Sequence, residues 1–155
     1  MATAISSTGM RPMNGKVFID TNVLVYAHTD LDPRKQLLAQ NLILDNDTFI
    51  SIQVLQELSN VSFKKFGKSW SEIEGVLANV IEANGIHTNS ETTVIAACKL
   101  AATYKYSFYD CLILNAALEG GCTTLLSEDL SDGQTIEGHV ISLILSGSSK
   151  SFLFA

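Results

Sequence analysis

Apolar residues along this chain follow two alternating patterns: short continuous runs and longer stretches with helical spacing. The short runs are typical of buried strands, which we predict at 17–19, 48–50, 86–88, 123–126 and 136–141. The longer stretches predict helices at about 20–28, 33–46, 51–61, 69–84, 90–104 and 107–119. Because strands that alternate with helices form βαβ units, we expect a three-layer α/β/α sandwich around a mainly parallel sheet of about five short strands.

Capping residues and apolar faces refine several of these helices. Asp32 before Pro33 resembles an N-cap followed by proline at the first helical position, and either Ser69 or Ser71 can open a capping box. Within 33–46, the residues expected to face the core are Leu37, Leu38, Leu42, Ile43 and Leu44.

Length and composition are those of one folded domain. A chain of 155 residues with 46% apolar residues can bury a single core, and no apolar run approaches the roughly 20 residues that span a bilayer. Residues 1–16 are rich in Ser, Thr and Gly and lack the apolar core of a secretory signal, so we expect a flexible N-terminal extension. The folded domain is then 17–145, followed by a C-terminal tail at 146–155.

The cysteines, the histidines and the net charge narrow the range of function classes further. The three cysteines and three histidines lack metal-ligand spacing, which favours free thiols in a cytoplasmic setting over disulfides or zinc. The net charge of −6, from 16 acidic and 10 basic residues, lacks the basic footprint of most nucleic-acid-binding proteins. An acidic metal site would explain most of this excess, so a polyanionic substrate bridged by cations stays compatible with the charge.

Four acidic residues stand where strands end or where helices face inward. Asp20 follows the first predicted strand, and Asp129 follows the fourth. Glu57 adjoins the apolar stripe of the third helix, and Asp110 lies among apolar residues near the start of the last helix. Because carboxylates that share a site repel one another, a set of this kind implies a bound cation, and Mg²⁺ and Mn²⁺ prefer oxygen ligands.

Each of these acids also has an ordinary structural explanation. Asp20 can be an N-cap, Glu57 a solvated helix position, and Glu128, Asp129 and Asp132 a turn cluster. Read together with the other acids, Asp20 is expected to be a metal ligand, and the capping role is left to Thr21 and Asn22. Thr21, Asn22 and Ser127 could also hold metal-bound waters as outer ligands.

The order of these motifs resembles that of PIN-domain nucleases, and in particular of VapC-type toxins. The matching segments are Phe18-Ile19-Asp20-Thr21-Asn22-Val23-Leu24-Val25-Tyr26-Ala27, Ile52-Gln53-Val54-Leu55-Gln56-Glu57-Leu58, Ser107-Phe108-Tyr109-Asp110-Cys111-Leu112-Ile113 and Leu126-Ser127-Glu128-Asp129-Leu130-Ser131-Asp132-Gly133-Gln134. The resemblance implies a PIN-like fold and a Mg²⁺- or Mn²⁺-dependent endoribonuclease. It assigns metal binding and catalysis to Asp20, Glu57, Asp110 and Asp129, with Asp132 as the alternative to Asp129. It also implies a homodimer and a small inhibitory antitoxin protein.

Substrate contacts have weaker signals. Lys64, Lys65 and Lys68 follow the helix that carries Glu57 and could meet RNA phosphates, or they could simply be a solvated helix end. Aromatic residues that could stack on bases are Trp70, Tyr104, Tyr106 and Tyr109, although for Tyr104 and Tyr109 we favour a core or dimer-interface position.

Two other functions compete with a ribonuclease. One is a catalytically silent PIN-like module that binds RNA or protein. The other is an aspartate-nucleophile phosphatase, which needs a second aspartate two residues after the first, where this chain has Asn22.

Overall fold

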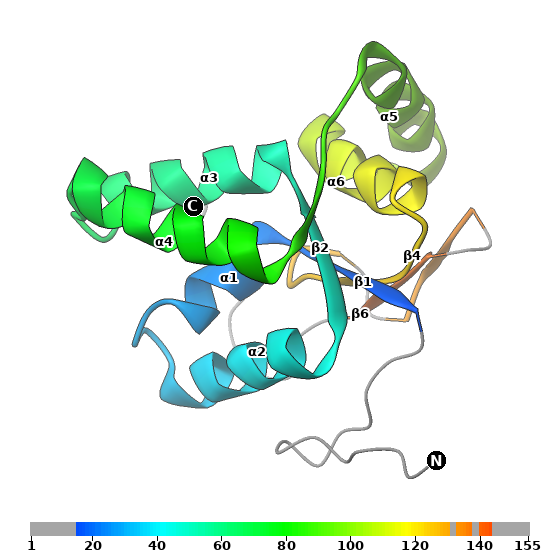
Figure 1. Cartoon of the computed structure of the whole chain (residues 1–155). Coiled ribbons are helices and arrows are strands. Elements are labelled where there is room, and N and C mark those ends of the chain that lie inside the picture. The colour runs from blue at the N-terminus through cyan, green and yellow to red at the C-terminus, as the bar shows by residue number, and fades with distance from the viewer. Residues whose placement is uncertain (1–14, 131–132, 138–139, 144–155) are drawn as a thin grey trace, which may run out of the picture.

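The computed structural model describes residues 15–130, 133–137 and 140–143 (Figure 1). Its elements in chain order are β1 (Lys16–Ile19), α1 (Thr21–Ala27), α2 (Pro33–Asp45), β2 (Asp47–Ser51), α3 (Ile52–Lys64), α4 (Trp70–Ala83), β3 (Gly85–His87), α5 (Glu91–Tyr104), α6 (Phe108–Glu119), β4 (Cys122–Leu126), β5 (Thr135–Ile136) and β6 (Val140–Leu143). The predicted alternation of strands and helices is confirmed. Lys16, assigned above to the extension, begins β1, whereas residues 1–14, Asp132 and the tail lie outside the described residues.

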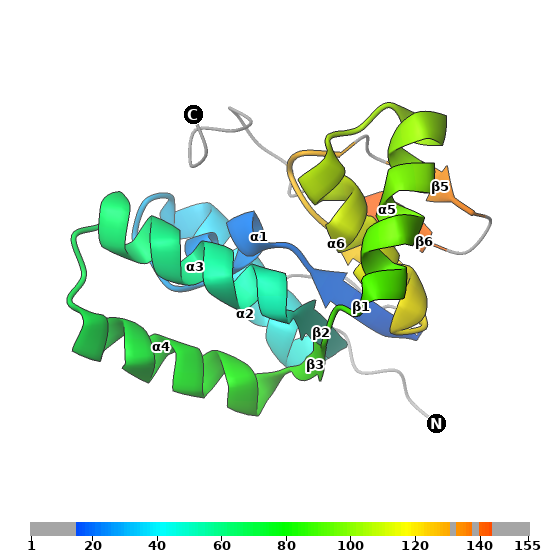
Figure 2. The same cartoon turned by 90° about the horizontal axis from the view of Figure 1, so that it is seen from above.

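The sheet has six strands in the order β3-β2-β1-β4-β6-β5. The neighbouring strands β3, β2, β1, β4 and β6 are parallel, and β5 runs antiparallel to β6 at the edge of the sheet. Figure 1 shows α2 on one side of the sheet and the pair α5–α6 on the other, while Figure 2 shows α3 and α4 running side by side. This arrangement confirms the expected three-layer sandwich.

The last predicted strand is wrong as a single element. Residues 136–141 were expected to be one strand, but β5 and β6 are two short strands that pair with each other. The physical reason lies at Glu137, whose φ of 50° is in the left-handed region and interrupts the extended backbone directly after β5.

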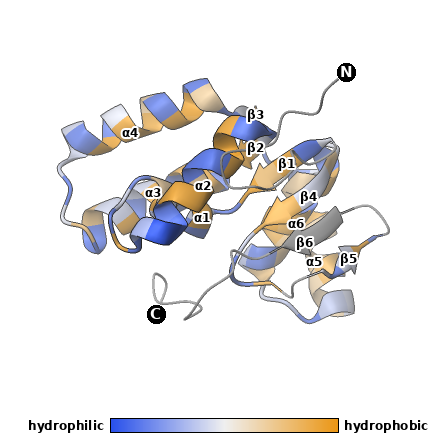
Figure 3. Ribbon diagram, turned by 90° about the horizontal axis from the view of Figure 1, so that it is seen from below, coloured by the Kyte–Doolittle hydropathy of each residue, from blue (hydrophilic) through white to orange (hydrophobic). Residues whose placement is uncertain are grey.

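The core is centred on β1, and one helix, α2, buries a different face than the apolar pattern suggests. Val17, Phe18 and Ile19 are fully buried, and Figure 3 shows β1 and β4 as apolar strands beside amphipathic helices such as α4. On α2, however, Leu37 and Leu44 are 61% and 80% exposed. The buried face consists of Lys35, Ala39 and Leu42, which recur at helical spacing, so the leucines of the predicted core face lie on opposite sides of the helix.

The topology places one edge of the sheet at a crevice. The chain leaves β1 toward β2 and β3 on one side and returns to β4 on the other, so β1 and β4 flank the point where the strand order reverses. Crevices at such points, outside the carboxyl ends of the strands, are the usual ligand sites of open α/β sheets. Among the described residues, no helix is long and apolar enough to cross a membrane.

Candidate functional site

Four acidic residues predicted from the sequence line one pocket of about 460 Å³. They come from four places in the fold: Asp20 after β1, Glu57 from the middle of α3, Asp110 from the first turn of α6 and Asp129 from the segment after β4. The remaining lining residues are Asn60, Val61, Tyr109 and Ile113. The pocket lies at the crevice that the strand order creates.

Asp20 is held rigidly at the junction of β1 and α1. Its side chain is only 6% exposed, its backbone N–H donates to the carbonyl of Leu126 at 3.0 Å, and its Oδ1 accepts from the backbone N–H of Thr21 at 2.7 Å. Asp20 is therefore the N-cap of α1, and the expectation that Thr21 and Asn22 would take this role instead is wrong. The other oxygen, Oδ2, accepts from the hydroxyl of Ser127 at 2.7 Å.

Each of the three polar residues predicted as outer partners contacts a different acid. Thr21 Oγ1 donates to Glu57 Oε2 at 2.6 Å, and Asn22 Nδ2 donates to Asp129 Oδ2 at 3.1 Å. Ser127, besides donating to Asp20, accepts from the backbone N–H of Asp129 at 3.1 Å. The hydrogen bonds thus link the carboxylates of three separate elements through neutral donors.

The two helical acids are also oriented by neighbouring polar groups. Gln53, one turn before Glu57, uses its Nε2 to donate to Glu57 Oε1 at 2.8 Å and to the carbonyl of Tyr109 at 3.2 Å. Ser107 caps α6 by accepting from the backbone N–H of Asp110 at 3.1 Å. Gln53 therefore ties α3 to the start of α6, next to Asp110.

Burial and mutual repulsion raise the pKa values of two of the acids. Burial, with contributions from the charges of Glu57 and Asp129, raises the pKa of Asp20 to about 7, against the opposing hydrogen bonds from Ser127 and Thr21. Burial and the charge of Glu57 also raise the pKa of Asp110, against the hydrogen bond with Ser107. The pocket therefore favours species that reduce its negative charge, namely protons or cations.

Comparison with protein families identifies this arrangement. The family model of the PIN domain matches residues 17–131, which includes all four pocket acids. The chain belongs to the PIN-domain family. An aspartate-nucleophile phosphatase is accordingly set aside.

Solved structures similar to this PIN domain come from toxin–antitoxin systems. VapBC2 from Rickettsia felis, bound to a DNA fragment from its promoter, has a TM-score of 0.62 at 20% identity, over 84% of this chain and 99% of that one. VapC20 from Mycobacterium tuberculosis, described as a sarcin–ricin-loop-cleaving toxin, has a TM-score of 0.60 at 16% identity, over 70% and 86%. A toxin–antitoxin complex from Klebsiella pneumoniae has a TM-score of 0.59 at 20% identity, over 81% and 95%. Comparison with curated protein sequences found no match.

The donor atoms of the pocket fit a hard divalent cation. All four acids offer carboxylate oxygens, and beside them Asn22 Oδ1 is a buried oxygen atom without a hydrogen-bond partner. Across the described parts of the chain, no three His, Cys, Asp or Glu side chains are already arranged as a metal centre. The acids instead accept hydrogen bonds from Thr21, Asn22, Gln53 and Ser127.

The lysines suggested as RNA contacts lie outside the pocket lining. Lys64 ends α3 seven residues after Glu57, so it shares the helical face of Glu57 about 10 Å further along the axis. Lys65 is the C-cap of α3. Lys68 lies near His28, and the pKa of His28 is lowered by burial and by the charge of Lys68.

Sequence reasoning misplaced one residue of the pocket and missed a residue that contacts one of the pocket acids. Tyr109 is 66% exposed and lines the pocket, so the predicted core position is wrong, whereas the alternative of a dimer-interface position stays a prediction. Gln53 was not singled out, although its position four residues before Glu57 places both side chains on one helical face.

Proposed function

We propose that this PIN domain is a divalent-metal-dependent endoribonuclease and the toxin of a toxin–antitoxin pair. The observation that carries the proposal is the pocket in which Asp20, Glu57, Asp110 and Asp129 converge from four separate elements. Repulsion among carboxylates makes such a pocket unfavourable unless cations or protons balance the charge. Membership in the PIN-domain family supports a nuclease.

Mg²⁺ or Mn²⁺ is the cofactor that the oxygen-only donor set supports. When bound, such an ion neutralises phosphate charge and lowers the pKa of water that attacks a phosphodiester. In our proposal the four acids hold the ion, with Asp132 kept as an alternative to Asp129. Thr21, Asn22 and Ser127 keep Glu57, Asp129 and Asp20 oriented through the hydrogen bonds described above.

RNA is proposed to approach the pocket along α3. Lys64 continues the helical face of Glu57, and Lys65 and Lys68 add two more cations beyond it. The exposed rings of Phe63 and Trp70 stack on each other at 4.4 Å next to these lysines, which offers an aromatic surface for an unpaired base. The description of the neighbour VapC20 as a loop-cleaving toxin supports this substrate class.

An antitoxin partner and a homodimer complete the proposal. The neighbours from R. felis and K. pneumoniae are toxin–antitoxin complexes, which supports a small antitoxin for this chain. A short open reading frame next to the gene is expected to encode it, and its co-expression should rescue growth. Failure to rescue contradicts the toxin role but not the nuclease activity.

A metal-dependent cleavage assay on total RNA tests the nuclease. Wild-type protein is expected to cleave with Mg²⁺ or Mn²⁺ and not with excess EDTA. Asp20→Asn and Asp110→Asn should each lower cleavage by more than the roughly 10- to 100-fold typical of losing an outer partner of a metal site. Glu74→Gln removes an exposed carboxylate from α4 and serves as the matched control. If wild-type protein binds RNA but cuts none with either metal, the silent binding module is the correct function.

A further inference from the structure

A buried ion pair joins α2 to the segment that carries Asp129. Lys35 Nζ donates to Glu128 Oε1, and the two residues are only 1% and 5% exposed. They are separated by 93 positions in the chain, so the contact depends on the tertiary structure, which brings α2 to the segment that follows β4. Lysine and glutamate are almost never buried to this extent unless they are paired.

The fold holds Lys35 in place from several directions. Its ammonium lies 4.6 Å from the centroid of the Tyr26 ring and 3.4 Å from the Tyr26 hydroxyl. Asp32, the N-cap of α2, accepts from the backbone N–H of Lys35 at 3.1 Å. These contacts restrain the position of the Lys35 ammonium group.

Glu128 lies between Ser127, which contacts a pocket acid, and Asp129, which lines the pocket. On one side, Ser127 donates to Asp20 and accepts from the backbone N–H of Asp129. On the other side, Asp129 accepts from Asn22 and lines the pocket. Of these three consecutive residues, Ser127 and Asp129 contact pocket groups, whereas the side chain of Glu128 is bound to Lys35.

We propose that the Lys35–Glu128 ion pair positions Ser127 and Asp129 for metal binding. The segment after β4 is neither helix nor strand, so its position depends on contacts of this kind. Because the carboxylates of Asp129 and Asp20 carry like charges, their repulsion favours movement of Asp129 away from the pocket. A buried ion pair on the adjacent residue resists that movement. The inference rests on the proposed metal-dependent function.

Mn²⁺ binding to the full-length protein, measured by isothermal titration calorimetry at constant pH, tests the positioning role. The informative variant is Lys35→Met combined with Glu128→Leu, which removes both buried charges and leaves no buried polar group from the pair. Replacing a buried ion pair by uncharged groups is often neutral for stability, so its melting temperature should stay close to that of wild type. Its Mn²⁺ affinity is expected to fall about 10- to 100-fold, as when an outer partner of a metal site is lost. A purely structural pair would leave the affinity unchanged.

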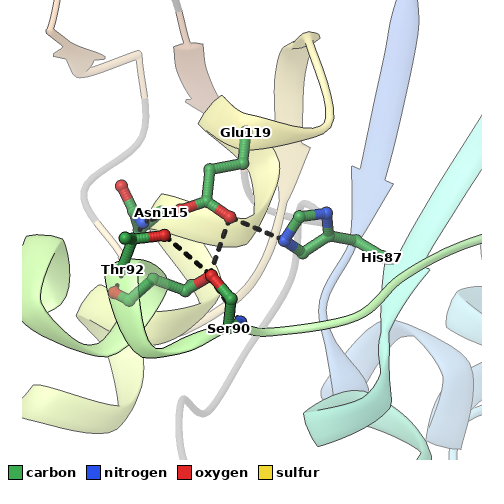
Figure 4. A network of polar contacts seen from close by, with 6 residues as sticks. His87, Ser90, Thr92, Asn115 and Glu119 are labelled. Carbon is green, nitrogen blue, oxygen red and sulfur yellow. Dashed lines mark hydrogen bonds and ion pairs between the residues drawn. The ribbon is translucent and has the colours of Figure 1, made fainter.

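A second contact between a basic and an acidic side chain supplies the control. His87 at the end of β3 and Glu119 on α6 interact at 2.8 Å within a polar network that also includes residues of α5 and is separate from the pocket residues (Figure 4). Combining His87→Gln with Glu119→Gln should leave Mn²⁺ affinity unchanged.

The outcomes separate this inference from the proposed function. Equal Mn²⁺ affinity of wild type and the Lys35–Glu128 double variant overturns the positioning role, while loss of binding in Asp20→Asn still supports the metal site. If Asp20→Asn binds Mn²⁺ as wild type does, or wild type does not bind it, both proposals fail. Should the first double variant not fold, Lys35→Leu combined with Glu128→Met, a second apolar pair, carries the test. Unchanged affinity in that variant overturns the positioning role.

Discussion

Replacing Asp20 by Asn should stabilise the protein at neutral pH in the absence of divalent cations, although it is expected to abolish cleavage. Asp20 is almost fully buried beside two other acids, and its pKa is about 7 in the folded protein against an ordinary value of 3.8. Between these two values the folded protein holds a proton that the unfolded chain has released. Stability therefore falls as the pH rises from about 4 to 7 and then levels off. Asn has the same shape and no such loss.

The pKa difference sets the size of the effect. A pKa of about 7 against 3.8 corresponds to about 4 kcal/mol of unfolding free energy above pH 7, of which about 2–3 kcal/mol develops between pH 5 and pH 8. The amide places an N–H group opposite Ser127, which weakens one hydrogen bond by about 1 kcal/mol. That cost does not depend on pH, so the change of the stability difference with pH isolates the carboxylate.

Urea unfolding of wild type and Asp20→Asn in EDTA, at several pH values from 5 to 8, measures this difference directly. The stability of the variant relative to wild type should rise by about 2–3 kcal/mol across the range, or about 3 °C in melting temperature per kcal/mol. Excess Mn²⁺ should reverse the order, because a ligand that binds the folded state stabilises it. A difference that stays constant within about 0.5 kcal/mol from pH 5 to 8 would refute the reasoning about the buried charge.

Two further predictions concern groups around the pocket. Gln53→Leu removes the donor that orients Glu57, so single-turnover cleavage should slow about 10- to 100-fold without a large change in melting temperature. The exposed control Gln56→Leu should behave as wild type. Equal rates for the two variants would exclude a role for Gln53. Lys64→Ala should weaken binding of single-stranded RNA and lower the slope of log K against log salt by about 0.7. The exposed control Lys99→Ala on α5 should change neither the binding nor the slope. An unchanged slope for Lys64→Ala means that this lysine contacts no phosphate.

Most elements of the fold could be predicted because their signals are local. Strand runs, helical spacing and capping residues such as Asp32 and Ser69 are set within a few residues, and the structure has these helices at the expected places. The strand expected at 136–141 failed because one left-handed residue, Glu137, interrupts a run that is apolar at both ends. No periodicity in the sequence indicates that conformation.

The pocket acids could be predicted for a topological reason. In a parallel sheet the carboxyl ends of the strands lie at one edge, so acids that follow β1 and β4 meet there regardless of the details of packing. The orientation of their side chains was beyond the reach of the sequence. The hydrogen bonds from Ser127 to Asp20 and from Thr21 to Glu57 depend on distances of a few ångström between elements.

By itself, the sequence determined the order of the elements, the α/β class and the two acids, Asp20 and Asp129, that the parallel topology brings to one edge. Only the tertiary structure decided which polar groups are buried with them. Lys35 became a core residue while Leu37 and Leu44 remained exposed, because Lys35 lies on the buried face of α2, where Glu128 from the segment after β4 provides the opposite charge. Pairing across 93 positions is a property of packing, and no local pattern of residues encodes it.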